Sequence, residues 1–306
     1  MQDVDRHDID TALSIARVTG FSGKFVALGG GEINNTYKLD FGDEQLILRI
    51  AKDEGRNTLI NEARALRLFN TKHIPKLIYF DEKSRVNNRL WIIESCLPGT
   101  IIRRLSINQF YNLGCLLSQV HREPSSEVKV ELRNQFIDSC KAFGDEQFLL
   151  SHPDAILRDL IRAAFKEFDS LQPTYDYIIP TLIHSDATPN NILVDGNEVG
   201  LIDWEFSKFS DPMRDFSTIY YEDIGYNQGK WRIKITAEEK QFLFAGYESV
   251  GGSIDEERIR YWIRYDKLGA AVFLYWRINQ SSRSTNQQEI EQYKLDYKNL
   301  IASLSS

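Results

Sequence analysis

The chain has 306 residues, 42% hydrophobic and 26% charged, with no compositionally biased tract, which is ordinary for a globular protein large enough for two lobes. Its formal net charge of −7 argues against nucleic acid or an anionic membrane surface as a partner. Its three cysteines lack metal-ligand spacing, so we expect them to be reduced thiols. No apolar run reaches the roughly 20 residues of a membrane span, and the polar start MQDVDRHDID differs from a signal peptide. We therefore expect a cytoplasmic protein.

Strand patterns dominate the first part of the chain. After a helical pattern at 8–19, a strand at 25–28, a glycine-rich turn and a second strand within 29–41 predict a hairpin whose backbone can approach phosphate groups closely. Further elements are predicted as strands at 45–50, 76–80 and 90–94, the last two joined by the polar turn SRVNNR, and as a helix at 57–70.

Arg49 lies within the apolar strand 45–50, where a charged side chain demands a partner or a ligand. Glu62 lies beside the apolar face of the helix predicted at 57–70. Two interpretations follow from these positions. The two residues can form a pair that binds a nucleotide, or Arg49 can face the surface while Glu62 is a solvated helical residue.

The pattern changes character at Pro98-Gly99, which follows a strand and is typical of a boundary. We therefore predict one lobe at residues 1–95 and a second, mostly helical lobe at 96–306. The helices expected in the second part are at 107–122, 130–143, 153–171, 211–221, 236–249, 255–280 and 286–303.

The stretch from Leu182 to Asp203 carries the clearest chemistry. His184 and Asp186 follow a short apolar run, and Asn191 comes five residues after Asp186. Two apolar runs around an Asp-Gly-Asn turn predict a β-hairpin that places Asn191 and Asp203 at the same open end, roughly 5–8 Å apart. An amide oxygen and a carboxylate so placed suit Mg²⁺, and Asp186 can accept a hydroxyl proton, as phosphoryl transfer requires.

The sequence HSDATPNNILVD, followed by LIDWEFSKFSDPMRD, resembles the catalytic segment of the aminoglycoside phosphotransferase and choline kinase superfamily, relatives of protein kinases. The family pattern is HxDxxxxN, then Ile-Asp before an aromatic residue or Gly, then a DPxxD-like run. Ser185 stands where Gly is usual, and Thr188 where a second His is frequent. The earlier hairpin is similar to the family's GGxxNxxY loop. The matching positions are His184, Asp186, Asn191, Asp203, Asp211 and Asp215 in the segment, and Gly30, Gly31, Asn34 and Tyr37 in the loop.

This resemblance implies an α+β, protein-kinase-like two-lobed fold, with an antiparallel β-sheet and one main helix in the N-lobe and a mostly helical C-lobe. It implies ATP, or GTP, and Mg²⁺ as cofactors, with Arg49 replacing the usual lysine that grips the phosphates and pairs with a helix Glu. Backbone groups near Glu94 to Cys96 would hold the adenine. The residues so implied are Gly30, Gly31, Asn34, Arg49, Glu62, Glu94 and Cys96 for the nucleotide, Asn191 and Asp203 for the metal, and Asp186 as the base.

The function expected on this basis is transfer of the γ-phosphate of ATP to a hydroxyl of a small molecule. Asp215 would brace the catalytic loop by hydrogen bonding. An acidic protein is compatible with a cationic acceptor, such as an aminoglycoside or a choline-like amino alcohol, and we expect a monomer or homodimer with no nucleic-acid or membrane partner. The candidate substrate residues are Trp204, Glu205, Tyr220 and Asp223.

Two other functions remain open. A protein kinase is disfavoured because Asp203 is followed by Trp-Glu rather than Phe-Gly, and because no Ala-Pro-Glu segment follows. A catalytically weak or dead nucleotide-binding relative is disfavoured because Asp186, Asn191 and Asp203 are all present. The replacement of lysine by Arg49 is its one support.

Overall fold

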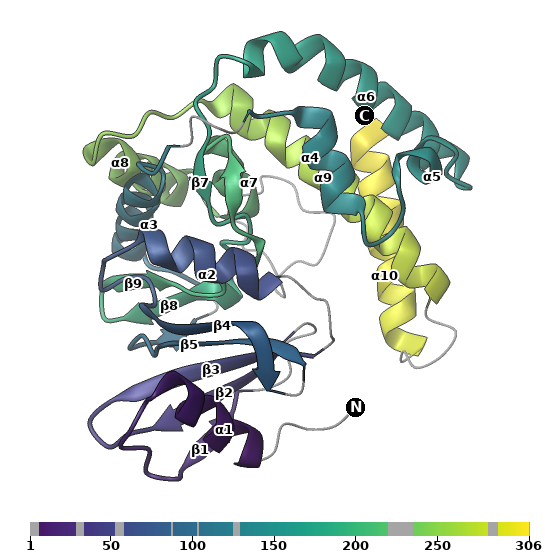
Figure 1. Cartoon of the computed structure of the whole chain (residues 1–306). Coiled ribbons are helices and arrows are strands. Elements are labelled where there is room, and N and C mark those ends of the chain that lie inside the picture. Colours follow the sequence, from purple (N-terminus) through teal and green to yellow (C-terminus); the bar gives the residue numbers. More distant parts are fainter. Residues whose placement is uncertain are drawn as a thin grey trace. The chain divides into compact units, whose positions relative to one another are not determined.

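A computed structural model describes residues 6–28, 34–52, 58–86, 88–102, 104–124, 129–219, 235–280 and 287–305. The chain divides into two compact units, one comprising Met1–Ile102 with Asn190–Lys208 and the other Arg103–Pro189 with Phe209–Ser306 (Figure 1). Each unit combines two separate stretches of the chain, whereas the lobes predicted at 1–95 and 96–306 are each one continuous stretch. The difference arises because the hairpin that carries Asn191 and Asp203 belongs to the first unit.

Five antiparallel strands form the main sheet of the first unit, in the order β1-β2-β3-β5-β4. Two helices lie on opposite faces of this sheet: residues of α1 pack with Leu48 and Trp91, and Glu62 of α2 bonds to Arg49 on the other face (Figure 1). The elements are α1 (Arg6–Ala16), β1 (Phe25–Ala27), β2 (Asn34–Asp40), β3 (Gln45–Ala51), α2 (Thr58–Leu68), β4 (Leu77–Val86) and β5 (Arg89–Ser95).

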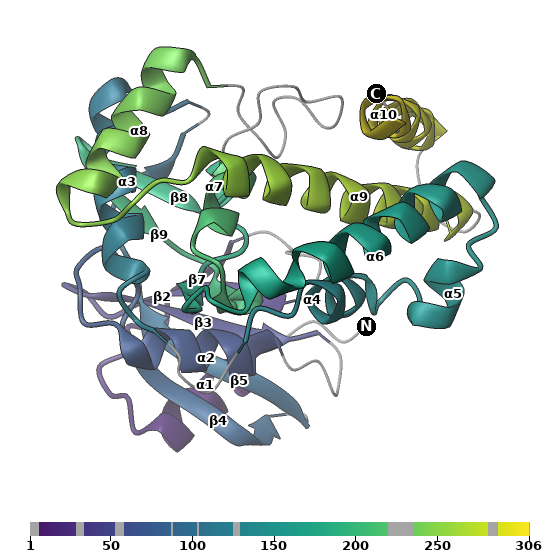
Figure 2. The same cartoon turned by 90° about the horizontal axis from the view of Figure 1, so that it is seen from above.

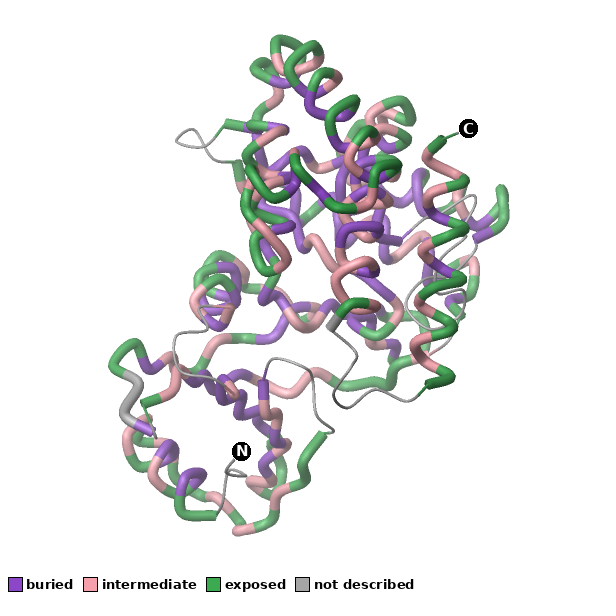
Figure 3. The backbone as a smooth tube through the Cα atoms, turned by 90° about the vertical axis from the view of Figure 1, so that its right-hand side faces the viewer, coloured by how far each residue is buried: buried purple, intermediate pink, exposed green. Residues whose placement is uncertain are grey.

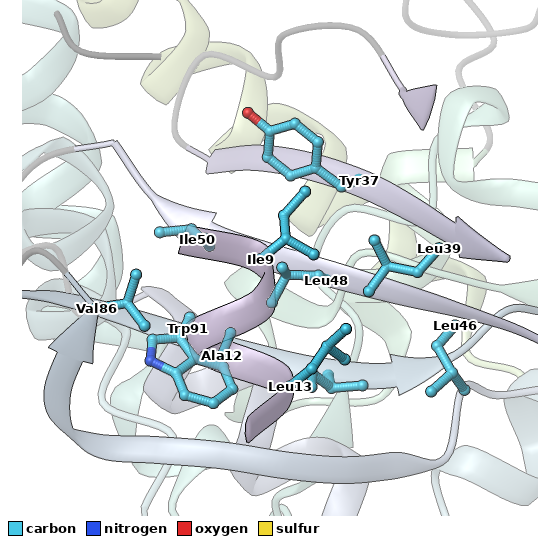
Figure 4. Packing of buried hydrophobic residues seen from close by; sticks show 11 residues of the cluster. Ile9, Ala12, Leu13, Tyr37, Leu39, Leu46, Leu48, Ile50, Val86 and Trp91 are labelled. Atoms are coloured by element: carbon cyan, nitrogen blue, oxygen red, sulfur yellow. The ribbon is translucent and has the colours of Figure 1, made fainter. Parts of the chain in front are cut away.

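Side chains of β3 alternate between the two faces of the sheet. Leu46, Leu48 and Ile50 point to the side of α1, where they are buried with Ile9 and Trp91 (Figure 4). Each such side chain stabilises the fold by about 1.5–3 kcal/mol when it leaves water. The position that carries Arg49 therefore faces the side of α2, because successive residues of a strand point to opposite faces.

A three-stranded sheet completes the first unit. β6 (Thr100–Ile101) pairs with β8 (Ile192–Asp195), which pairs with β9 (Glu198–Leu201) across the predicted turn. Gly99 precedes β6 with a φ of 109°, and a Cβ atom there would lie 2.7 Å from the carbonyl oxygen of Val194. Glycine is therefore required where the chain passes the hairpin, and this passage ties the hairpin to the first unit.

The second unit is mostly helical, and α9 is its central element. Figure 2 shows α9 as a long helix with α6 crossing it, and α9 also contacts α4, α7 and α10. Trp262 of α9 is fully buried, and its ring packs against Tyr175 and Tyr265. The remaining elements of the chain are α3 (Ile107–Val120), α4 (Leu132–Cys140), α5 (Glu146–Leu150), α6 (Ala155–Tyr175), β7 (Thr181–Ile183), η1 (Pro189–Asn191), η2 (Trp204–Phe206), β10 (Lys208–Ser210), α7 (Met213–Ile219), α8 (Ala237–Ser249), α9 (Glu256–Gln280) and α10 (Gln287–Ser305).

Side-chain caps fix where three of these helices begin. Ser106 and Thr236 accept hydrogen bonds from the first turns of α3 and α8, and the side chains of Gln109 and Glu239 bond back to them. Asp154 accepts a hydrogen bond of 2.9 Å from the first turn of α6. Each cap satisfies backbone donors that a helix start leaves open and contributes about 1 kcal/mol.

The predicted α+β composition is confirmed, with an antiparallel sheet early in the chain and helices after it. Two details were predicted wrongly. β4 continues to Val86, which pairs with Arg89, so the sheet takes in residues that we assigned to a polar turn. The helix α5 was missed because five residues are too few to show helical periodicity. Buried residues follow the strands of the first unit and the inner sides of the helices of the second (Figure 3).

None of the helices in the described part of the chain is both long enough and apolar enough to span a lipid bilayer.

Helices α3 and α8 cross at two glycines, and this crossing gives a stability prediction. A Cβ atom on Gly246 would lie 2.0 Å from the carbonyl oxygen of Tyr111, and one on Gly114 would lie 2.0 Å from that of Leu243. Overlap with backbone atoms can be relieved only if the helices move. We expect Gly246→Ala to lower the free energy of unfolding by about 1–3 kcal/mol, as measured by urea denaturation.

Gly269, within α9, provides the matched control, because a Cβ atom there would meet nothing within 4 Å. Gly269→Ala should raise the free energy of unfolding by up to about 1 kcal/mol, since alanine has the higher helix propensity. Equal effects of the two substitutions would contradict the close crossing of α3 and α8.

Candidate active site

Arg49 is the centre of a charged cluster in the first unit. Its strand has a neighbour on each side, with Thr36 of β2 and Ile92 of β5 opposite Arg49. The residue is only 7% exposed, so water does little to balance its charge. A buried cation requires partners within the protein.

Carboxylates of α2 and of the segment after β9 supply these partners. Arg49 Nη1 donates to Glu62 Oε1 at 2.5 Å, and Arg49 Nη2 donates to Asp203 Oδ1 at 2.7 Å. Glu205 Oε2 lies 3.7 Å from Nη2 and accepts a hydrogen bond of 2.6 Å from Asn34 Nδ2. Arg49 therefore joins three elements of the first unit, and it bonds to Glu62 as the nucleotide-binding interpretation expected.

Acidic groups outnumber the guanidinium in this cluster. Burial by itself lowers the pKa of Arg49, but Glu62, Asp203, Glu94 and Glu205 outweigh it and hold this pKa above its usual value. Burial raises the pKa of Glu94 to about 7 and that of Glu205 to about 7, although Arg49 opposes both increases. Burial also raises the pKa of Glu62, again against the charge of Arg49. Arg49 therefore stays charged among an excess of acids.

Asp203 has the backbone conformation that favours glycine, with a φ of 68° and a ψ of 65°. A non-glycine residue held there costs about 1–3 kcal/mol. The backbone N–H of Ile202 donates to the carbonyl oxygen of Asn191 at 3.0 Å, so Asn191 and Asp203 lie at the same end of the hairpin. This is the placement that the hairpin pattern predicted.

The residues at this end of the hairpin fit Mg²⁺ by their chemistry. The Asp203 side chain is 33% exposed, and it is surrounded by more acids than Arg49 can neutralise. A carboxylate and an amide oxygen are hard ligands of the kind that Mg²⁺ takes, usually with several waters. Among the described residues no group of three or more His, Cys, Asp or Glu could hold a metal ion.

In the second unit, Asp215 braces the loop that carries Asp186. Asp215 is fully buried, and its carboxylate accepts hydrogen bonds from the backbone N–H groups of His184 at 2.8 Å and Ser185 at 2.7 Å. Its Oδ2 atom also lies 3.0 Å from His121 Nε2. Burial by itself raises the pKa of Asp215, but these hydrogen bonds and the two histidines hold it below its usual value. The loop is therefore fixed by an ionised carboxylate.

Ser185 has a φ of 66°, in the left-handed region that favours glycine. The next residue, Asp186, donates its backbone N–H to His184 Nδ1 at 3.3 Å, and its carbonyl oxygen accepts from the N–H of Thr188 at 2.7 Å. These bonds and those to Asp215 give the loop a defined backbone.

A pocket of about 280 Å³ lies beside this loop within the second unit, and Ser185 contributes to its lining. Arg214 and Asp266, also in the lining, are bonded at 3.2 Å, so their charges balance. Gly269 of α9 borders the pocket and leaves open space in it. A concave surface of this size with a few polar groups suits a small polar molecule.

Two residues predicted to contact substrate lie instead in the interior of the first unit. Trp204 is fully buried, its ring centroid is 5.1 Å from that of Phe69, and its indole N–H donates to the carbonyl oxygen of Leu201 at 3.1 Å. Glu205 is 6% exposed and bonded to Asn34. Burial leaves Trp204 no exposed ring face for a cation, so this placement differs from the one expected.

Two of the residues predicted to bind the nucleotide, Cys96 and Glu94, have their groups engaged within the protein. The backbone N–H of Cys96 donates to the carbonyl oxygen of Gln45 at 3.1 Å, so sheet pairing uses that donor. Glu94 is 4% exposed, and its carboxylate acts on the charged cluster around Arg49. Four other predicted residues, Gly30, Gly31, Tyr220 and Asp223, lie outside the described residues.

Arg214, Asp266 and Gly269 are among the residues that line the pocket in the second unit and that the sequence did not single out. Two signals were present in the helix predicted at 255–280. Asp266 is an acid in a segment rich in aromatic residues, and Gly269 is a glycine within a helix, where it costs about 1 kcal/mol relative to alanine.

Residues 24–262 match the model of the phosphotransferase enzyme family. The chain is also 26% identical over 204 residues to protein LicA of Haemophilus influenzae, an alignment that covers 63% of this chain and 56% of that protein. The chain therefore spans little more than half the length of this curated relative.

Solved structures resemble the chain over nearly its whole length. A spectinomycin phosphotransferase in complex with ADP and spectinomycin has a TM-score of 0.65 and 18% identity, with 99% of this chain and 98% of that chain covered. Choline kinase LicA from Streptococcus pneumoniae has a TM-score of 0.64 and 18% identity, with 97% and 100% covered. These likenesses confirm the protein-kinase-like α+β fold. Because the family model matches most of its length, the chain belongs to the phosphotransferase enzyme family.

Proposed function

We propose that this protein transfers the γ-phosphate of ATP to a hydroxyl group of a small molecule. The observation that carries the proposal is the bonded set of Arg49, Glu62 and Asp203, which holds a fixed cation against a carboxylate at the end of a hairpin. Phosphoryl transfer needs both, since its catalysis consists mainly of positioning and charge stabilisation.

In this proposal Asn191 and Asp203 would hold Mg²⁺, beside the hydrogen bond that Arg49 donates to Asp203 Oδ1. When bound, the metal would neutralise charge on the phosphoryl group in transfer. Arg49 would bind phosphate oxygens, because its guanidinium is planar, always charged and able to donate several hydrogen bonds at once.

Asp186 is the proposed base that orients the acceptor hydroxyl and takes its proton. The support is the loop around it, since Asp215 fixes the backbone of His184 and Ser185 on its N-terminal side. A base held in place in this way typically contributes about 10²–10⁴-fold to the rate.

The proposed acceptor is a hydroxylated, cationic small molecule that binds in the pocket lined by Ser185. Two of the structural relatives are named for such molecules, spectinomycin and choline. Phe143 and Phe273 line the same pocket and offer aromatic surface to a cation.

The first experiment is ATP consumption with Mg²⁺ over a panel of choline, ethanolamine, spectinomycin and streptomycin. We expect at least one of these compounds to stimulate consumption, with one phosphorylated product formed per ATP used. Failure of ATP with Mg²⁺ to raise the melting temperature would contradict the proposal at its first step, because a bound ligand must stabilise the folded state.

Asp203→Asn tests the metal assignment. The substitution keeps the size of the side chain but removes the charge that we assign to Mg²⁺. We expect turnover to fall by at least about 10²-fold and the Mg²⁺ concentration for half-maximal activity to rise. Asp195→Asn, at the exposed turn end of the same hairpin, should leave both quantities unchanged. Equal activity of the two variants would refute the assignment.

Asp186→Asn tests the base. Asparagine keeps the shape and hydrogen bonding of the side chain but cannot take a proton, so kcat should fall by about 10²–10⁴-fold. The affinity for ATP with Mg²⁺, measured by isothermal titration calorimetry, should change little because Asp186 is not a proposed metal ligand. Asp159→Asn, an exposed position on α6, is the control. Turnover of Asp186→Asn within a few-fold of wild type would sink this mechanism.

Gly269→Leu tests the acceptor pocket. Leucine should fill the open space beside α9, raising KM for the acceptor at least about tenfold while KM for ATP stays within twofold. Arg260→Leu, exposed on the same helix, controls for the added apolar side chain. An unchanged acceptor KM in Gly269→Leu would place the acceptor elsewhere.

A further inference from the structure

Arg49, Glu62 and the Asp203–Trp204 dipeptide form a closed ring within the first unit. Arg49 Nη1 donates to Glu62 Oε1 at 2.5 Å, and the backbone N–H of Trp204 donates to the same oxygen at 3.2 Å. Arg49 Nη2 donates to Asp203 Oδ1 at 2.7 Å, which closes the ring through the peptide bond between residues 203 and 204.

This ring restrains Asp203, whose backbone is strained. Asp203 has a φ of 68° and a ψ of 65°, a conformation that costs a non-glycine residue about 1–3 kcal/mol. The ring restrains the dipeptide at two points, the side chain of Asp203 and the N–H that follows it. Hydrogen bonds that involve charged groups are worth about 1.5–3 kcal/mol each, which is enough to offset the strain.

The ring is closed by two donor nitrogens that one rigid, planar group holds apart. The two bonds come from different nitrogens of the same guanidinium, and each reaches a different element, α2 in one case and the segment after β9 in the other. Lysine carries the same charge on a single nitrogen at the end of a flexible chain. Its three N–H donors share that one nitrogen, so Glu62 and Asp203 would both have to approach a single atom, and lysine lacks the rigid fork that holds both in fixed relation.

We infer that Arg49 is a positioning residue that keeps Asp203 in its left-handed conformation, and that lysine at this position cannot replace it. The inference rests on the proposed function for the role of Asp203 as a metal ligand. It goes further by assigning Arg49 a task that depends on the shape of its side chain and not on its charge alone.

Surrounding contacts make the ring rigid. Glu62 is fully buried, so its carboxylate cannot turn to water when one partner is lost. Glu205 Oε2 lies 3.7 Å from Arg49 Nη2 and is held by Asn34 at 2.6 Å, which limits the space in which the guanidinium can tilt. An unbranched lysine at position 49 would therefore have to serve Glu62 and Asp203 from one nitrogen, in a space shaped for a planar guanidinium.

The test is Arg49→Lys, which keeps the charge and changes the geometry. We would measure the dissociation constant of Mn²⁺, a paramagnetic substitute for Mg²⁺, from protein saturated with ADP, using electron paramagnetic resonance of free Mn²⁺. Saturation with ADP removes any change in nucleotide affinity from the result. We expect Mn²⁺ to bind about 10–100-fold more weakly, the usual effect of losing a residue that orients a metal ligand.

Arg133→Lys is the matched control. Arg133 also bridges two carboxylates, those of Glu146 and Asp169, but it lies on the surface of the second unit with 37% of its side chain exposed. Exposed pairs contribute little, so Mn²⁺ affinity in this variant should stay within twofold of wild type.

Each outcome decides between the hypotheses. If wild-type protein binds no Mn²⁺ in the presence of ADP, the proposed function fails and the inference fails with it. If wild type binds Mn²⁺ and folded Arg49→Lys binds it within twofold of wild type, the inference alone is overturned. Should circular dichroism show Arg49→Lys unfolded, Glu62→Gln replaces it, because it weakens the ring at another corner. Unchanged Mn²⁺ affinity in folded Glu62→Gln would equally overturn the inference.

Discussion

The first unit depends on one buried guanidinium. Arg49 lies on a strand with neighbours on both sides, where neither water nor the sheet itself can satisfy its charge. Its partners therefore have to come from other elements, Glu62 from α2 and Asp203 from the segment after β9. Removing one partner of a buried ion pair typically costs about 3–5 kcal/mol, so the positions of these elements are coupled through a single residue.

The second unit uses the opposite charge for the same purpose. Asp215 is buried, and its carboxylate collects the backbone N–H groups of His184 and Ser185 together with the ring of His121. Charge-assisted hydrogen bonds to backbone groups are short and strong, so they fix a loop that contains no regular secondary structure. In each unit, then, one buried ion sets the backbone beside a residue to which we assign chemistry.

The parts of this structure that local patterns determine were predictable from the sequence. The apolar run at 45–50 predicted the strand β3, and the turn after Asp195 predicted a hairpin with Asn191 and Asp203 at one end. A charged residue among apolar neighbours at position 49 also indicated a partner or a ligand, and a pair with Glu62 was one of the two interpretations.

The parts that depend on distant residues were not predictable. The hairpin belongs to the first unit through the passage of Gly99 beside Val194 and a hydrogen bond of 2.9 Å from the N–H of Leu201 to the carbonyl oxygen of His73. No local sequence pattern predicts either contact. We expected Trp204 to contact substrate. The sequence alone does not distinguish an exposed aromatic residue after Asp203 from a buried one, and the contact of Trp204 with Phe69 shows that it is buried.

Backbone strain in this protein is concentrated where the proposed chemistry is. Among the described residues four that are not glycine have a positive φ, namely Arg17, Asn88, Ser185 and Asp203. Arg17 follows the end of α1, and Asn88 lies between two antiparallel strands, both places where left-handed residues ordinarily occur. Ser185 precedes the proposed base and Asp203 is a proposed metal ligand, and no helix end or hairpin turn accounts for either. Each is instead held by a buried ion, Asp215 in one case and Arg49 in the other. Strain that the rest of the fold does not require, and that a buried charge is needed to maintain, is better explained by the demands of the site than by those of folding.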